Sequence, residues 1–221
     1  MLALVLATVP CLFWLWSVWR HDDHEREPWG FVVLAVVLGG LSPLAVLWAR
    51  PIIEHWLAPV SPLVDAFVVT ALAEELWKAL FFVPLLVLPE LDEPLDGCVY
   101  GAAVGLGFAA FENAFFIGAS GNAQLAIQRV FTATLMHAAC SGCIGLALAC
   151  AKLRGLTWLR TGYLGVALAV PVLLHGLYDF YLSGARAHAM ISLLLVLPAA
   201  LALLSVKLRW ARRRSSYYHA T

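Results

Sequence analysis

The chain has 221 residues, of which 62% are hydrophobic and 13% are charged, whereas soluble domains are about 45–50% apolar and about 25% charged. This composition indicates a protein embedded in a lipid bilayer. The formal net charge is zero and no glycine-rich nucleotide loop is recognisable, so nothing suggests a nucleic-acid partner. The five cysteines are expected to be small buried residues, although Cys140 and Cys143 have the spacing of a weak metal motif.

About 20 apolar residues cross a bilayer as a helix, and the hydrophobic pattern therefore predicts an all-α, polytopic bundle. Seven segments are predicted to be membrane spans: Leu2–Trp19, Phe31–Ala49, Leu63–Leu88, Cys98–Gly118, Leu125–Ala151, Trp158–Leu182 and Ala189–Leu208. The third and fifth are long enough to tilt or to contain a break. We expect one membrane-embedded domain, residues 1–221, with residues 207–221 forming a basic cytoplasmic tail.

The distribution of lysine and arginine predicts the orientation of these spans. With seven spans, ten basic residues fall on one side of the membrane, and only Arg50 and Arg186 fall on the other. Because basic loops stay in the cytoplasm, we expect the N-terminus outside and the C-terminus inside. The expected location is the plasma membrane of a bacterial or archaeal type of cell, crossed several times.

Ionisable side chains interrupt four of the apolar spans. They are Glu74, Glu75 and Lys78 in the third, Glu112 beside Asn113 in the fourth, Arg129 and His137 in the fifth, and His175 and Asp179 in the sixth. Each such group costs at least about 2.5–3.5 kcal/mol on insertion scales. Several such groups on four helices are hard to explain by packing, and they indicate a functional site. Arg129 is expected to reach the interface.

Helical spacing predicts which of these groups meet. Glu74 and Lys78 are four residues apart and share a face, so Lys78 is expected to pair with Glu74, while Glu75 points about 100° away. His175 and Asp179 are also four apart. Asp179 is therefore expected to accept the second imidazole N–H of His175, or to bind a metal itself.

Each polar group also has a purely structural explanation, which the sequence leaves open. Glu74 with Lys78 could fix helix packing, His137 could be a satisfied core histidine, and His175 with Asp179 could join two helices. Gly101, Gly105 and Gly107 are among the small residues that allow a close helix crossing.

Together, these residue types suit the hydrolysis of a peptide bond inside the membrane. A metal held by imidazole and carboxylate groups polarises a carbonyl and activates water, and a free carboxylate then acts as general base and later as acid. The prediction is that His137, His175 and one glutamate bind a divalent metal, for which zinc is best suited. Ser141 or Cys140 beside His137 lacks the supporting motifs of a nucleophile.

The series of motifs resembles that of the PrsW family over residues 15 to 180. The matching runs are Glu74-Glu-x-x-Lys78, Gly101…Gly105-x-Gly107-Phe…Glu112-Asn113, His137 after Arg129, His175-Gly-x-x-Asp179, and Asp22 or Asp23 before Glu25-x-Glu27-Pro28. The resemblance implies a membrane-embedded, metal-dependent protease that cuts a membrane-anchored protein or peptide. The family is distantly related to the CAAX-processing and bacteriocin-immunity proteases and to a scaffold subunit of γ-secretase.

The resemblance also implies roles for single residues. Glu74 and Glu75 match the paired glutamates, of which the CAAX-processing relatives use the first to activate water, so Glu74 is favoured. The alternative is that Glu74 is occupied by Lys78 and that Glu75 is the base. His137 and His175 match the histidines expected to bind the metal. Glu112 stands where the distant relatives carry a histidine, which leaves it as a ligand or as a neighbour of the ligands.

Asp179 stands where those relatives usually carry an asparagine, so an amide that stabilises the oxyanion is not assured, and Asn113 is the candidate substitute. Two other classes of protein compete with a protease. One is a non-catalytic membrane scaffold or immunity-type protein, and the other is a proton-coupled transporter, which also uses buried Glu, His and Asp. The internal repeats typical of transporters are not seen.

Overall fold

The computed structural model describes residues 2–20, 26–58, 60–155 and 158–218, and this part of the chain contains helices and no strand. The elements are α1 (Leu2–Trp19), α2 (Trp29–Leu57), α3 (Pro62–Val64), the π-helix η1 (Asp65–Leu72), α4 (Ala73–Phe82), the 3₁₀-helix η2 (Val83–Val87), α5 (Pro94–Ser120), α6 (Ala123–Phe131), α7 (Ala133–Leu153), α8 (Trp158–Leu182), α9 (Arg186–Ile191), the π-helix η3 (Ser192–Val196) and α10 (Leu197–Tyr218).

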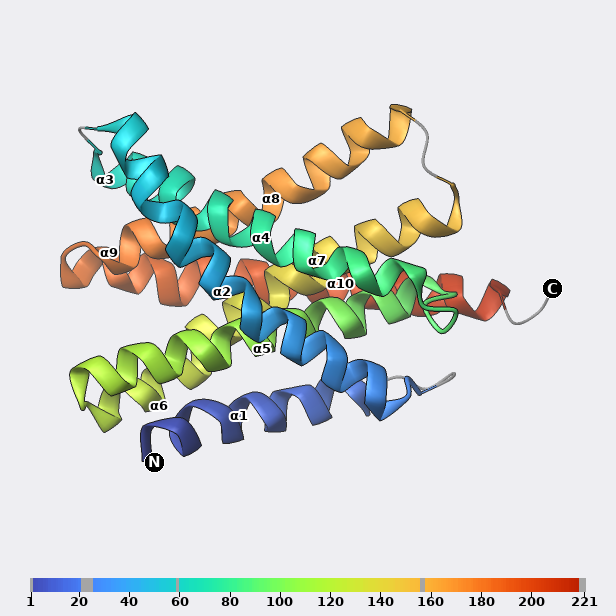
Figure 1. Ribbon diagram of the computed structural model, residues 1–221, viewed down its shortest axis with the longest axis horizontal. Coiled ribbons are helices and arrows are strands. Elements are labelled where there is room, and N and C mark those ends of the chain that lie inside the picture. The colour runs from blue at the N-terminus through green and yellow to red at the C-terminus, as the bar shows by residue number, and fades with distance from the viewer. Residues whose placement is uncertain (1, 21–25, 59, 156–157, 219–221) are drawn as a thin grey trace.

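The helices run back and forth between the two ends of the molecule (Figure 1). One end carries the N-terminus and the connections that follow α2, α5 and α8. The other end carries the C-terminus and the connections that follow α1, η2 and α7. The chain therefore alternates between two ends, as expected of a polytopic membrane protein.

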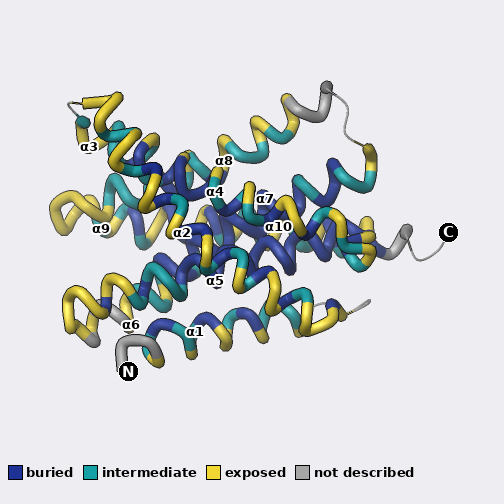
Figure 2. Tube along the Cα trace, viewed as in Figure 1, coloured by how far each residue is buried: buried dark blue, intermediate teal, exposed yellow. Residues whose placement is uncertain are grey.

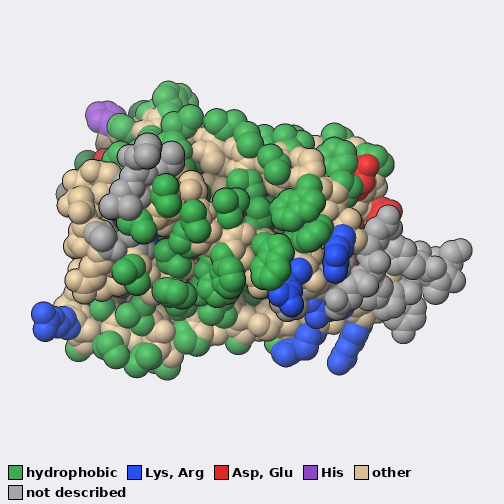
Figure 3. Space-filling model, turned by 90° about the horizontal axis from the view of Figure 1, so that it is seen from below, with side chains coloured by type: hydrophobic (Ala, Val, Ile, Leu, Met, Phe, Trp, Pro, Cys, Tyr) green, Lys and Arg blue, Asp and Glu red, His purple; other side chains and the backbone are tan. Residues whose placement is uncertain are grey.

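Within the described residues, five helices are long and apolar enough to cross a membrane. These candidate spans are Trp29–Leu57, Pro94–Ser120, Ile127–Leu153, Gly162–Leu182 and Arg186–Ser215. The first predicted span holds a shorter apolar helix, Val5–Trp19, and the predicted third span is divided among α3, η1, α4 and η2. In Figure 3 hydrophobic side chains cover the middle of one face, while most Lys and Arg side chains gather toward one end. The protein is an integral membrane protein.

The two long predicted spans do contain breaks. Asp65–Leu72 is a π-helix directly before the glutamate pair, and π-helical turns are frequent at functional sites. In the fifth predicted span, Thr132 leaves helical geometry, with φ −126° and ψ −86°. Arg129 and His137 consequently lie on separate helices, α6 and α7.

A glycine-lined crossing of α5 with α7 forms the centre of the bundle. A Cβ atom on Gly101 would lie 2.4 Å from the carbonyl oxygen of Ser141, and one on Gly105 would lie 2.4 Å from that of His137. Only glycine allows backbones to approach this closely, as the sequence predicted. Gly107 makes a similar approach to Val36 of α2. Figure 2 shows α7 and the first part of α5 as mostly buried.

The structure also bears on the cysteines and on the C-terminal segment. All five cysteines are free and buried, as expected. The described part of the predicted tail, up to residue 218, continues the helix α10, in which Ala211 and Ser215 are buried.

Candidate active site

Three side chains from three helices meet inside the bundle. Glu74 of α4, His137 of α7 and His175 of α8 each offer one ligand atom, and these atoms all lie within 4.8 Å of one another. All three residues are buried. The two imidazole rings lie 5.0 Å apart between centroids and are nearly perpendicular, at 87°. The structure thus brings together both histidines and one of the three glutamates that the sequence singled out.

The buried ion pair of α4 differs from the prediction. Lys78 Nζ lies 2.6 Å from Glu75 Oε1 and 3.1 Å from His137 Nδ1, and the expected pair between Lys78 and Glu74 is wrong. Glu75 and Lys78 are three residues apart and both turn into the bundle, with side chains 0% and 1% exposed, whereas Glu74 lines a cavity. Since buried charges must be paired, Lys78 neutralises the deeper carboxylate and leaves Glu74 available.

His175 contacts both Glu75 and Asp179, and Glu75 makes the shorter contact. Its Nδ1 lies 2.8 Å from Glu75 Oε1. Its Nε2 lies 3.3 Å from Asp179 Oδ2 and 3.8 Å from Glu74 Oε2. Asp179 therefore contacts His175, but at the nitrogen that also faces Glu74. A carboxylate on Nδ1 fixes the tautomer that leaves Nε2 free as a ligand, and Glu75 occupies that position.

Glu112 lies on the other side of His137. Its Oε2 is 2.8 Å from His137 Nε2 and 2.5 Å from Arg129 Nη2. Arg129 Nε also donates to Asn113 Oδ1 at 2.6 Å, and Asn113 Nδ2 donates to Thr134 Oγ1 at 2.9 Å. Arg129 is expected to reach the interface, and in the structure its guanidinium is engaged by these internal partners, with the side chain only 14% exposed.

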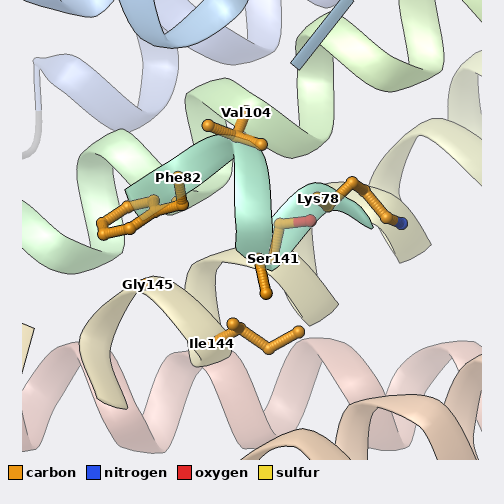
Figure 4. A pocket seen from close by; sticks show the side chains of 8 residues that line it. Lys78, Phe82, Val104, Ser141, Ile144 and Gly145 are labelled. Carbon is orange, nitrogen blue, oxygen red and sulfur yellow. The ribbon is translucent and has the colours of Figure 1, made fainter. Parts of the chain in front are cut away.

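A cavity of about 990 Å³ opens beside the cluster, between α2, η1, α5 and α8. Glu74, Glu112 and Asp179 line it, and the phenyl rings of Phe108, Phe111, Phe115 and Phe116 are part of its apolar wall. A far smaller void of about 10 Å³ lies behind Lys78, between α4, α5 and α7 (Figure 4), with room for about one water molecule. Of these two spaces beside the cluster, only the large cavity has room for more than about one water molecule.

Two residues beside the cluster, Arg50 and Thr134, were not among the predicted site residues. Arg50 lines the cavity and bridges Glu54 and Asp65, at 2.7 and 2.8 Å. The sequence signal for Arg50 is a lone arginine after a long apolar run. That pattern alone does not distinguish a residue of the cavity from one that only sets the topology. Thr134, which anchors Asn113, gave no signal, because threonine is common in helices of every kind.

The acidic segment after the first helix is only partly described. Asp22, Asp23 and Glu25 lie outside the described residues. Glu27 is buried and accepts a hydrogen bond from the Tyr100 hydroxyl. It lines a separate cavity of about 270 Å³, between the α1–α2 and η2–α5 connections, and is therefore not part of the histidine cluster.

The cluster suits a metal ion. Two imidazoles and nearby carboxylates are a donor set typical of zinc enzymes, and the span of 4.8 Å is compatible with one ion. Glu74 Oε2 is buried without a hydrogen-bond partner. A cation held by the two imidazoles would bring a positive charge close to this oxygen, which otherwise carries the cost of an unpaired buried group.

A helical membrane protein with such a cluster beside a cavity has the features of an intramembrane hydrolase. A family model described as PrsW family intramembrane metalloprotease matches residues 27–205. The chain is 34% identical to Protease PrsW of Geobacillus kaustophilus over 163 residues, which are 73% of this chain and 71% of that protein. The chain therefore belongs to the PrsW family and is an intramembrane protease.

Other relatives agree. Protease PrsW of Clostridioides difficile is 29% identical over 80% of this chain and 78% of its own length, and that of Bacillus subtilis is 29% identical over 83% and 84%. No solved structure gives a significant match. The family assignment favours the protease over the scaffold and the transporter. The distant relationship to the CAAX-processing proteases stays a prediction.

Proposed function

We propose that the protein hydrolyses a peptide bond of a membrane-anchored protein or peptide, in a metal-dependent reaction at the cavity beside Glu74. One observation carries this proposal. Glu74, His137 and His175 converge within 4.8 Å. Glu74 and Glu75 each have a buried carboxylate oxygen without a hydrogen-bond partner, and of these two glutamates only Glu74 lines the cavity of about 990 Å³. A cavity of this size suits a segment of peptide rather than a small ion alone.

His137 and His175 would hold the metal together with the carboxylate of Glu112, and zinc is the ion that such ligands suit best. When bound, the ion supplies Lewis acidity to the scissile carbonyl and to water. Glu75 accepts a hydrogen bond from the Nδ1–H of His175 and so keeps Nε2 directed at the site, while Lys78 neutralises Glu75. Arg129 orients Glu112 in the same way.

Glu74 is assigned the proton transfer. Its carboxylate accepts a proton from the attacking water as the new C–O bond forms. It returns that proton to the amide nitrogen as the C–N bond breaks, so that the amine leaves neutral. Asp179 contacts His175 at the edge of the cavity and is assigned to binding the substrate beside it. Asn113, whose amide is engaged by Thr134 and Arg129, is assigned to holding Arg129 rather than to an oxyanion.

The test is the cleavage of a membrane-anchored reporter by Glu74→Gln, with Glu90→Gln at the opposite end as the matched control. Loss of a general base should slow cleavage by about a hundredfold or more, with bound metal unchanged and with Glu90→Gln fully active. Loss of both cleavage and metal would instead make Glu74 a ligand. Normal cleavage by Glu74→Gln would refute the assignment.

We also infer seven membrane crossings with a cytoplasmic C-terminus, in the bacterial plasma membrane. Support comes from the connections that alternate between two ends (Figure 1) and from the concentration of basic residues at one of them. A cysteine placed at Asp92, in the η2–α5 connection, should resist an impermeant thiol reagent added to intact cells. Labelling from outside would overturn this topology.

A further inference from the structure

A second large cavity lies at the end of the molecule that carries the C-terminus. It has a volume of about 530 Å³ and is formed by the end of α7, the first half of α8 and the middle of α10. Its lining residues are Leu146, Cys150, Ala151, Arg154, Tyr163, Val206, Lys207 and Trp210. Most of this lining is apolar, and the two charged residues are both basic. The cavity is therefore amphipathic and has no part in the histidine cluster.

The two cations lack acidic partners. The side chains of Arg154 and Lys207 make no ion pair or hydrogen bond with any described residue, in contrast to Lys78 and Arg129, which are fully engaged. An unpaired cation beside an apolar cavity is favourable only near water or an anion. The cavity therefore attracts a negatively charged group to its basic side.

The first half of α8 has few protein neighbours. In Figure 1 this part of α8 diverges from α7 and α10. Figure 2 shows its residues 162–170 as exposed and intermediate. A Cβ atom on Gly162 or Gly165 would meet nothing within 4 Å, and Val166 is 65% exposed. This surface is apolar and uncovered by protein, and in a membrane it is covered by lipid.

The composition of the cavity rim fits the membrane interface. Tyr163 and Trp210 are aromatic residues of the kind that concentrate at headgroup level. Four more arginines follow on α10, at positions 209, 212, 213 and 214. Basic pockets between transmembrane helices on the cytoplasmic side bind anionic lipid headgroups.

We propose that the cavity between α7, α8 and α10 binds one anionic phospholipid. The phosphate group would lie between Arg154 and Lys207, and an acyl chain would follow the apolar lining and the uncovered face of α8. A free phosphate would use only the basic half of the site, and a zwitterionic lipid would bring a cation to two unpaired cations. The lipid would support the helix that carries His175, independently of the chemistry at that residue.

The experiment uses the full chain in detergent, with bound lipid counted by native mass spectrometry. Dioleoyl phosphatidylglycerol should be retained in preference to dioleoyl phosphatidylcholine, and it should raise the unfolding temperature. The double variant Arg154→Gln/Lys207→Gln should bind phosphatidylglycerol about thirtyfold more weakly, as two basic contacts predict. The double variant Arg20→Gln/Arg209→Gln, with equal loss of charge at the same end, should bind normally.

Two further measurements separate the source of the anion and guard against misfolding. Val206→Trp keeps the charge but fills the cavity, and it should also weaken binding of the lipid. Glycerol phosphate, which lacks acyl chains, should not displace it. Equal retention of the two lipids, or equal losses in both double variants, would overturn the proposal. Displacement by glycerol phosphate would reduce the site to an anion site and would overturn it as well.

Discussion

The two histidines of the cluster lie on spans that differ widely in burial. In the most apolar stretch of the span that includes α7, 89% of the residues are buried, whereas in that of α8 22% are buried. The backbone of His137 lies against Gly105 of α5, and its ring contacts Lys78 and Glu112. Within the described residues, the backbone of His175 has no such close helix crossing, and its position depends on Glu75 and on the ring of Phe67 packed on the neighbouring Gly176. Backbone packing therefore supports one half of the site, whereas the other half depends on side-chain contacts.

This difference suggests how a buried site can admit a peptide. The large cavity lies on the α8 side, between α8, η1, α2 and α5, and not at the glycine-lined crossing. We expect α7 to hold its place while α8 and the π-helix η1 adjust to a substrate. Substitutions on either side of the cluster test this difference.

The largest effect is expected from Lys78→Met, because Lys78 contacts both halves of the site. The change leaves the carboxylate of Glu75 buried without its cation, which costs about 3–5 kcal/mol. We expect a large fall in thermal stability and in metal content. The double variant Lys78→Met/Glu75→Gln removes the stranded charge and should regain most of the stability. An unchanged unfolding temperature for Lys78→Met would contradict the ion pair.

An intermediate effect is expected from Gly105→Ala on the packed side. The new Cβ would lie 2.4 Å from the carbonyl oxygen of His137, and two helix backbones cannot easily part, so overpacking should cost about 1–3 kcal/mol. Gly165→Ala on α8, where the Cβ meets nothing within 4 Å, is the matched control and should be neutral or slightly stabilising. Equal unfolding temperatures for the two variants would remove the distinction between the halves.

A smaller effect is expected from Gly176→Ala on the side that depends on side-chain contacts. Its Cβ would lie 2.5 Å from Phe67 Cδ1, but a side chain can give way where a backbone cannot. We expect weaker metal binding and slower cleavage, with less loss of stability than Gly105→Ala causes. Phe67→Leu should rescue Gly176→Ala in the double variant. Failure of this rescue would show that Phe67 does not position His175.

The sequence was sufficient to predict that the ionisable groups of the apolar spans meet. Burial of an unpaired ionisable group is costly, so partners were expected for the glutamate pair, the two histidines and the arginine. The sequence could not decide which glutamate pairs with Lys78, because positions three and four residues away are nearly equivalent on a helix. The π-helix at Asp65–Leu72 changes the helical phase just before Glu74. No residue pattern in the sequence predicts this π-helix. Seven predicted spans exceed the five that length and composition support within the described residues. The first predicted span holds only a shorter apolar helix, Val5–Trp19, and the third is divided into short helices that carry the charged cluster.

Metal dependence is the central claim, and the direct measurement is the metal content of the purified protein together with its cleavage of a membrane-anchored reporter. The account predicts one divalent ion bound per chain, loss of cleavage when a chelator removes it, and recovery when zinc is restored. His175→Ala should lose both the ion and the activity, while Glu90→Gln should keep both. A protein that is free of metal and cleaves the reporter at the full rate would contradict the account.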